Sequence, residues 1–245
     1  MQPDAILEVL DRAGHAVHDA LEGFSEKGYS GLRDTQYKLD LVADEAVLNV
    51  LLAAGIAVVS EESGRSGAEG GLVCVVDPID GSTNCDHGVP FFSTSLCVLD
   101  DEGPLVGYVR NQATGVTYRA VRGGGATRDG QPITPSGTTN LSEAIIAFSG
   151  LPAQHYGWAQ YRALGAASLE MCLVADGSLD GYLQAGYTHI NPWDYLAALL
   201  ICREAGAVVE EHDDLDLIVA GAAKRRPVAA ANAALAAQLR LEATR

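Results

Sequence analysis

Hydrophobic positions in the first part of the chain recur at the spacing of α-helices. Apolar side chains over residues 6–21 fall every third or fourth position, which predicts an amphipathic helix. A second run of this kind, over residues 44–54, precedes Gly55, a residue type that commonly ends helices. The chain therefore begins with two predicted helices.

From residue 56 the pattern changes to short, continuous apolar runs. The Val-rich segments 56–60 and 72–76 are bounded by Gly and acidic residues, which predicts buried strands. Three more predicted strands follow, at 92–99, 105–110 and 115–120, joined by segments of turn composition. Because these connections are too short for crossover helices, we expect a mostly antiparallel sheet.

After residue 143 strands and helices alternate. The predicted order is strand 144–148, helix 166–175, strand 182–185, helix 193–205 and strand 207–209, with an Ala-rich helix at 229–237. This alternation predicts a second sheet layered with helices, so the fold class is α+β with an α/β second half. We place a domain boundary after the Pro/Ser/Gly/Thr-rich segment 132–140, giving domains 1–143 and 144–245.

Composition and charge restrict the partners. Of the 245 residues 48% are hydrophobic and 20% charged, and the formal net charge is −16, which disfavours nucleic acid as a main partner. The acidic N-terminus does not resemble a signal peptide, and no apolar run has the length of a membrane span. Five cysteines are scattered without a C-x-x-C pair, which favours free thiols over a zinc site. We expect a cytoplasmic protein.

Acidic residues recur directly after predicted buried strands. Glu61 follows the strand 56–60, Asp77 follows 72–76 and Asp80 comes three positions later, while Asp194 falls in the first turn of a predicted helix. Each alone is compatible with a turn, a helix cap or a solvated edge. Carboxylates that meet at one sheet edge repel each other unless a cation lies between them, and oxygen ligands suit Mg²⁺. The spacing of Asp77 and Asp80 is compatible with bridging two cations about 4 Å apart.

The residues after Asp80 have the character of a phosphate-binding turn. Gly81 permits close approach of a ligand, and the backbone N–H groups that follow it can receive a phosphate. Hydroxyl groups on Ser82 and Thr83 would stand beside the metals, where one can orient a water molecule. Acidic residues that can bind cations lie next to backbone N–H groups that can bind a phosphate. This combination predicts a phosphoryl-transfer site.

The motifs that carry these residues resemble those of a known family. The run Asp-Pro-Ile-Asp-Gly-Ser-Thr-Asn at 77–84, with His-Gly-Val-Pro-Phe at 87–91, closely resembles the central signature of the inositol monophosphatase family. Its second signature is similar to Trp-Asp-Tyr-Leu-Ala-Ala at 193–198, and shorter matches lie at 38–44, 60–63 and 162–167. The matches stand in family order from about residue 38 to 209.

This resemblance implies a layered αβαβα sandwich, a homodimer, and lithium-sensitive catalysis with two to three Mg²⁺ ions. Glu61, Asp77 and the Ile79 carbonyl would bind the first ion, and Asp77, Asp80 and Asp194 the second. A third ion would sit near Glu61 through water. The other implied roles are water activation by Ser82 with Asp44 (or Asp40), phosphate binding by Gly81, Ser82 and Thr83, and substrate contacts from Asp80, Gly165, Ala167 and Gln184.

Two departures from the family pattern bear on function. Serine replaces the usual threonine at Ser82, and the substrate-contacting glutamate falls on Gln184, which is neutral and both donates and accepts hydrogen bonds. The expected reaction is hydrolysis of a small phosphorylated substrate resembling inositol 1-phosphate by a metal-activated water. Fructose 1,6-bisphosphate, histidinol phosphate and 3′-phosphoadenosine 5′-phosphate are alternative substrates, and a non-catalytic metal- or phosphate-binding protein is the alternative outside enzymes.

Overall fold

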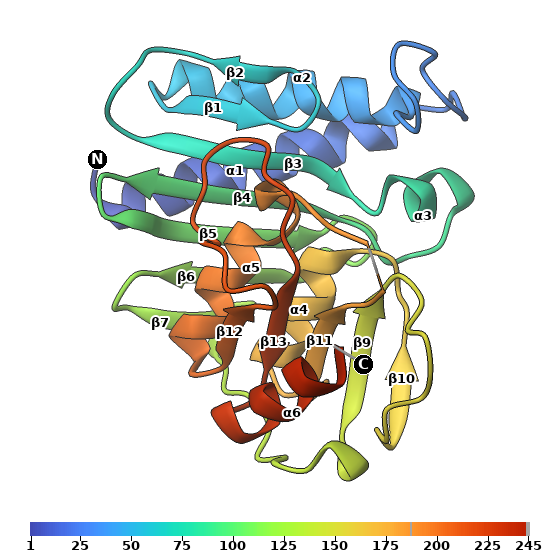
Figure 1. Ribbon diagram of the computed structural model, residues 1–245. Helices are drawn as coiled ribbons and strands as arrows, with labels where there is room; N and C mark the ends of the chain where they lie inside the picture. The colour runs from blue at the N-terminus through green and yellow to red at the C-terminus, as the bar shows by residue number, and fades with distance from the viewer. Residues whose placement is uncertain (187, 244–245) are drawn as a thin grey trace.

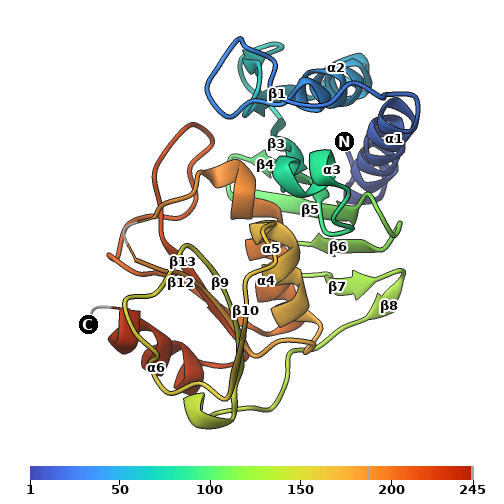
Figure 2. The same cartoon turned by 90° about the vertical axis from the view of Figure 1, so that its right-hand side faces the viewer.

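The computed structural model describes residues 1–186 and 188–243, with the side chains of 1–186 and 188–240. Its elements stack as five layers, in the order helices, sheet, helices, sheet, helix (Figures 1 and 2). The predicted αβαβα sandwich is therefore confirmed. Within the described residues, no helix is both long enough and apolar enough to span a membrane.

Two helices, α1 (Pro3–Glu22) and α2 (Lys38–Ala53), form the first layer and cover the outer face of the larger sheet (Figure 2). The predicted start of α2 at residue 44 is wrong, because the helix begins at Lys38. The Asp40 carboxylate accepts a hydrogen bond from the Tyr37 backbone N–H at 2.8 Å, which caps the first turn. This earlier start buries Asp40 near the end of the sheet where the acidic motifs lie.

The larger sheet has the strand order β2-β1-β3-β4-β5-β6-β7-β8. Its strands are β1 (Ala57–Ser60), β2 (Gly64–Ser66), β3 (Val73–Asp80), β4 (Ser93–Asp100), β5 (Gly103–Asn111), β6 (Thr117–Val121), β7 (Gly125–Arg128) and β8 (Gln131–Pro132). Only the β1–β3 pair is parallel among these described strands, which confirms the mostly antiparallel prediction. β3 runs four residues past the predicted end at 76, and its register with β4 shifts between Asp77 and Asp80.

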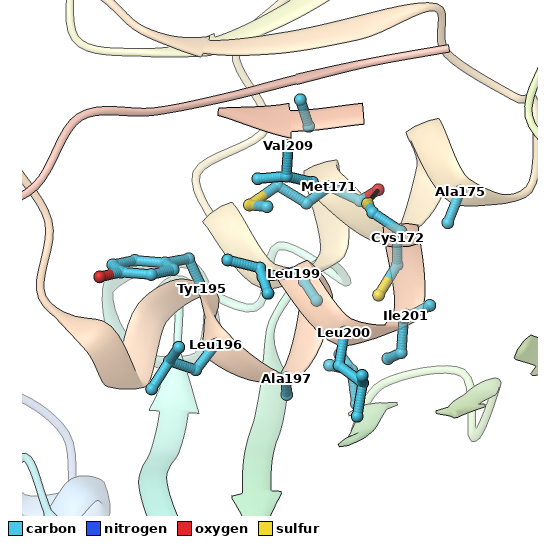
Figure 3. Close-up of a cluster of buried hydrophobic side chains, with 14 of the residues drawn as sticks. Met171, Cys172, Ala175, Tyr195, Leu196, Ala197, Leu199, Leu200, Ile201 and Val209 are labelled. Carbon is cyan, nitrogen blue, oxygen red and sulfur yellow. Dashed lines mark hydrogen bonds between the residues drawn. The ribbon is translucent and has the colours of Figure 1, made fainter. Parts of the chain in front are cut away.

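The middle layer consists of α4 (Ala167–Ala175) and α5 (Pro192–Ala205). Figure 3 shows part of the buried cluster in which Met171 of α4 and Leu199 of α5 pack beneath Val209 of the second sheet. The same cluster contains Val75 of the first sheet, so the two halves of the chain share a hydrophobic core. The domain division at residue 143 falls between the two sheets and stays a prediction.

The smaller sheet has the strand order β10-β9-β11-β13-β12, and α6 (Ala233–Ala243) covers its outer face (Figure 2). Its strands are β9 (Ile145–Ser149), β10 (Gln160–Arg162), β11 (Gly181–Gln184), β12 (Val208–Glu211) and β13 (Pro227–Ala230); η1 (Leu141–Glu143) precedes them. The helix predicted at 229–237 is wrong in its first part, because Ala229 and Ala230 belong to a fully buried strand. An alanine run has no polar face, so its pattern does not separate strand from helix.

The cysteines behave as expected for small buried side chains. Four of the five are buried, Cys85 is half-buried, and all are free thiols. Burial raises the pKa of Cys85 to about 11, so this thiol stays protonated near neutral pH.

Candidate active site

Two parallel strands bring the first acidic residues together. β1 and β3 run side by side with Ser60 opposite Val76, so both strands reach the same edge of the sheet. The Glu61 backbone N–H donates to the Val76 carbonyl oxygen at 3.1 Å, which places Glu61 beside Asp77. The parallel pairing converts a separation of sixteen residues in the chain into direct proximity.

Asp194 joins them from the beginning of α5. Its carboxylate accepts a hydrogen bond from the Asn191 backbone N–H at 2.6 Å, and Pro192 occupies the first turn, so the helix start fixes its position. Carboxylate oxygens of Glu61, Asp77 and Asp194 all lie within 4.8 Å of one another. Three of the four predicted acidic ligands thus converge, although they come from three separate parts of the chain.

Electrostatics show that this group is suited to a cation. Burial, followed by repulsion from neighbouring acids, raises the pKa of Glu61 to about 8 and that of Asp77 well above its usual value. Burial also raises the pKa of Asp194 to about 6, although the hydrogen bond from the Asn191 backbone N–H lowers it. Without a positive charge nearby, Glu61 and Asp77 therefore favour their protonated forms at neutral pH. A divalent cation removes that conflict, and the all-oxygen donor set fits Mg²⁺.

Asp80 lies beside this group and connects it to α4. Its Oδ2 accepts hydrogen bonds from the Ser168 backbone N–H at 2.7 Å and the Ser168 hydroxyl at 2.5 Å, and its Oδ1 accepts from the Ala167 N–H at 3.2 Å. Burial and then Asp194 raise the pKa of Asp80 to about 7. Oδ1 accepts a single hydrogen bond, so one of its lone pairs remains open to a metal.

The Ser82 side chain lies near Asp40, whereas Asp44 is hydrogen-bonded to Ser60, so this geometry favours Asp40 as the partner of Ser82 and the role of Asp44 stays a prediction. Ser82 Oγ donates to the Ile79 carbonyl oxygen at 2.8 Å, and its side chain also interacts with Asp40 and lowers the pKa of that carboxyl. Burial outweighs this and raises the Asp40 pKa to about 6. Asp44 instead accepts a hydrogen bond from the Ser60 hydroxyl at 2.5 Å. The early start of α2, which the sequence pattern missed, causes the difference.

The turn after β3 requires glycine. Gly81 has φ +91°, and a Cβ at this position would lie 3.0 Å from the Gly165 carbonyl oxygen and 3.3 Å from that of Phe91. The short helix α3 (Ser82–His87) follows at once and carries two of the three expected phosphate-binding residues, Ser82 and Thr83. The Asn84 side chain amide donates to the carbonyl oxygens of Phe91 and Leu164, both at 2.7 Å, and so fastens the turn to the Gly165 segment.

The predicted substrate contacts divide into two groups. Gly165 and Ala167 lie against Gly81 and Asp80, at the site. Gln184 is buried in β11, where its amide donates to Thr188 Oγ1 at 2.7 Å and its carbonyl accepts from the Tyr182 hydroxyl at 2.9 Å. Both polar ends of Gln184 are therefore used inside the protein, and the structure does not bring it into the pocket.

A pocket of about 310 Å³ lies beside the acidic group, and Glu61 is the member of that group that lines it. Its lining residues are Arg33, Asp34, Thr35, Gln36, Asp40, Glu61, Glu62, Ser82, Asn191 and Trp193. Four of them come from the loop between α1 and α2, a segment without a strong sequence motif. The sequence motifs did not identify these residues, which lie directly before the family match at 38–44.

Comparison with known proteins decides the family. The sequence profile described as the inositol monophosphatase family matches residues 4–244. The chain belongs to the inositol monophosphatase family. It is 31% identical over 210 residues to an inositol-1-monophosphatase of Synechocystis sp., covering 79% of this chain and 71% of that protein. It is 36% identical over 184 residues to a fructose-1,6-bisphosphatase/inositol-1-monophosphatase of Archaeoglobus fulgidus, covering 71% and 69%.

A solved structure supports the same conclusion for this inositol monophosphatase family member. The inositol monophosphatase from Anabaena superimposes with a TM-score of 0.80 at 26% identity, covering 97% of this chain and 95% of that one. The family and the enzyme class predicted from the motifs, a phosphoric monoester hydrolase, are confirmed.

Proposed function

We propose that this protein hydrolyses a small phosphate monoester with Mg²⁺, and that a polyol phosphate resembling inositol 1-phosphate is its substrate. The observation that carries the proposal is the convergence of Glu61, Asp77 and Asp194 within 4.8 Å beside the Gly81 turn. Their mutual repulsion is relieved by cations, and the turn offers backbone donors to a phosphate. The names of the relatives from Synechocystis and Archaeoglobus agree with this substrate class.

The residues present fit two metal positions, with a third ion near Glu61. Glu61, Asp77 and the Ile79 carbonyl would hold one ion, and Asp77, Asp80 and Asp194 the other. When bound, Mg²⁺ would supply the positive charge that makes a water more acidic and that neutralises phosphate oxygens. Asp77, the most deeply buried member of the group of three, would contribute to both positions.

Ser82 and Asp40 would orient the attacking water and remove its proton. Asp40 is buried, and its Oδ1 has no hydrogen-bond partner among the described residues, so an acceptor is available there. A water that donates to Ser82 Oγ can pass its proton on when that hydroxyl donates to Asp40. Because the pKa of Asp40 is about 6, the carboxyl is ionised and able to accept at neutral pH.

The remaining substrate contacts are proposed from position. The Gly81, Ser82 and Thr83 backbone would bind the phosphate, while Asp80 and the Gly165–Ala167 segment would meet the hydroxyls of the leaving alcohol. Gln184 stands in place of the expected glutamate, and its hydrogen bonds hold it within β11. We therefore propose no carboxylate contact at this position that would select an inositol ring. Fructose 1,6-bisphosphate, histidinol phosphate and 3′-phosphoadenosine 5′-phosphate therefore stay in the substrate set, and a homodimer remains part of the proposal.

A phosphate-release screen tests the function. Purified protein is assayed with sugar, cyclitol, nucleotide and amino-alcohol phosphates, with Mg²⁺ or EDTA and with or without lithium. We expect Mg²⁺-dependent release that lithium inhibits, and its loss in Asp80→Asn and Asp194→Asn. The exposed Glu69→Gln variant serves as the matched control. Full turnover in both aspartate variants would remove the metal assignment, and phosphate binding by calorimetry without any turnover would favour a non-catalytic protein.

A further inference from the structure

The loop between α1 and α2 places a cationic side chain at the mouth of the catalytic pocket. Within this loop the Ser30 N–H donates to the Gln36 carbonyl oxygen at 2.8 Å, and Tyr29 pairs with Tyr37 as an antiparallel bridge. The two pairs close the loop like a hairpin, and Arg33 lies at its tip. The Tyr37 hydroxyl donates to Thr83 Oγ1 at 3.2 Å, which connects the base of the loop to the phosphate-binding turn.

Arg33 is held by the segment that follows β1. Its guanidinium donates to the Glu61 backbone carbonyl oxygen at 3.0 Å and forms an ion pair with the Glu62 carboxylate. The Glu62 side chain is only 7% exposed, whereas the Arg33 side chain is 47% exposed. The Gln36 amide donates to the same Glu62 oxygen. Glu62 thus keeps a donor if Arg33 leaves, and Arg33 is free to move into solvent.

The charge in the pocket is strongly one-sided. Four of its lining residues are acids, namely Asp34, Asp40, Glu61 and Glu62, and of the described lining residues Arg33 alone carries a positive charge. A phosphate dianion entering this pocket meets repulsion except at the metals and at Arg33. A guanidinium presents paired N–H donors that match two phosphate oxygens.

We propose that Arg33 is a phosphate-binding residue that exchanges Glu62 for oxygens of the substrate phosphate. This inference rests on the proposed phosphatase function and adds a specificity residue from the α1–α2 loop. In the ligand-free protein Glu62 holds the guanidinium at the pocket. When phosphate arrives, Arg33 turns to it while Gln36 continues to satisfy Glu62. Loss of the Arg33 guanidinium should therefore lower the affinity for phosphate and its esters.

The test compares Arg33→Gln, Arg33→Lys and Glu62→Gln with the exposed, pocket-remote Arg65→Gln as matched control. Binding of inorganic phosphate in the presence of Mg²⁺ is measured by calorimetry, together with KM and kcat for phosphate release. We expect Arg33→Gln to weaken phosphate binding and raise KM about tenfold, the range of one charge-assisted hydrogen bond at a partly exposed site, with little change in kcat. Arg33→Lys should recover part of that loss.

Glu62→Gln distinguishes ligand exchange from a structural ion pair. It releases Arg33, so phosphate binding should stay equal or become tighter, opposite to Arg33→Gln. Equal weakening in both variants, with equal loss of thermal stability, would mean that the pair only holds the loop and would overturn the inference. Unchanged phosphate affinity in Arg33→Gln would overturn it as well. Failure of the proposed function is separate, because it shows as wild-type protein that binds phosphate but releases none.

Discussion

Replacing Glu61 by glutamine tests whether repulsion among Glu61, Asp77 and Asp194 destabilises the folded protein when no cation is bound. The folded-state pKa of Glu61 is about 8, against an ordinary value of 4.5. Between these values the folded protein keeps a proton that the unfolded chain releases. Stability therefore falls as pH rises from about 4.5 through 8 in the metal-free protein. Glu61→Gln removes this charge while preserving the shape of the side chain.

The size of the effect follows from the shift. One pKa unit corresponds to about 1.4 kcal/mol, so the shift of Glu61 sets an upper limit of roughly 5 kcal/mol. Asp77 and Asp194 share protons with Glu61, which lets the group avoid part of that cost. We expect metal-free Glu61→Gln to exceed wild type at pH 9 by about 2 kcal/mol, or roughly 5 °C in Tm for a chain of this length.

The assay is thermal unfolding at pH 5 to 9 in EDTA and again in saturating Mg²⁺. At pH 5 the two metal-free proteins should be nearly equal, because folded Glu61 is then protonated. Mg²⁺ should raise the Tm of wild type at pH 8, since a ligand that binds only the folded state stabilises it, and should do so far less in the variant. Glu69→Gln, at an exposed position, controls for the loss of one charge. A metal-free wild type whose Tm rises between pH 6 and 9 would refute the reasoning.

Three further substitutions examine the water-activating pair and the turn. Asp40→Asn should lower kcat by about a hundredfold or more, as for loss of a general base, whereas Asp44→Asn should chiefly weaken the contact with Ser60 and cost about 1 kcal/mol of stability. Steady-state kinetics and urea unfolding separate these outcomes. A larger loss of kcat in Asp44→Asn than in Asp40→Asn would assign the catalytic role to Asp44. Gly81→Ala places a methyl group 3.0 Å from the Gly165 carbonyl oxygen at φ +91°, so we expect roughly 2 kcal/mol of destabilisation and loss of phosphate release; normal activity would contradict the tight turn.

Local patterns predicted most of the elements because burial imposes a period on them. The apolar spacing of residues 6–21 and the Val-rich run at 72–76 both became the expected helix and strand. The patterns failed where a polar contact or a neighbouring element decides the outcome. α2 begins at a capping interaction between Tyr37 and Asp40, and the spacing of hydrophobic residues does not reveal such an interaction. Ala229 and Ala230 become a strand because β11 and β12 pair with them on both sides.

The sequence by itself determined the chemistry: acids placed after buried strands, a glycine turn and hydroxyls beside it point to metal-assisted phosphoryl transfer, and the motif order indicates the family. Only the tertiary structure decided which side chains meet. It placed the Ser82 side chain near Asp40, turned Gln184 into β11, and brought Arg33 to the pocket. The reason is physical. Residue type and local spacing set what a side chain can do, whereas its partners depend on where α2, β11 and the α1–α2 loop pack against distant parts of the chain.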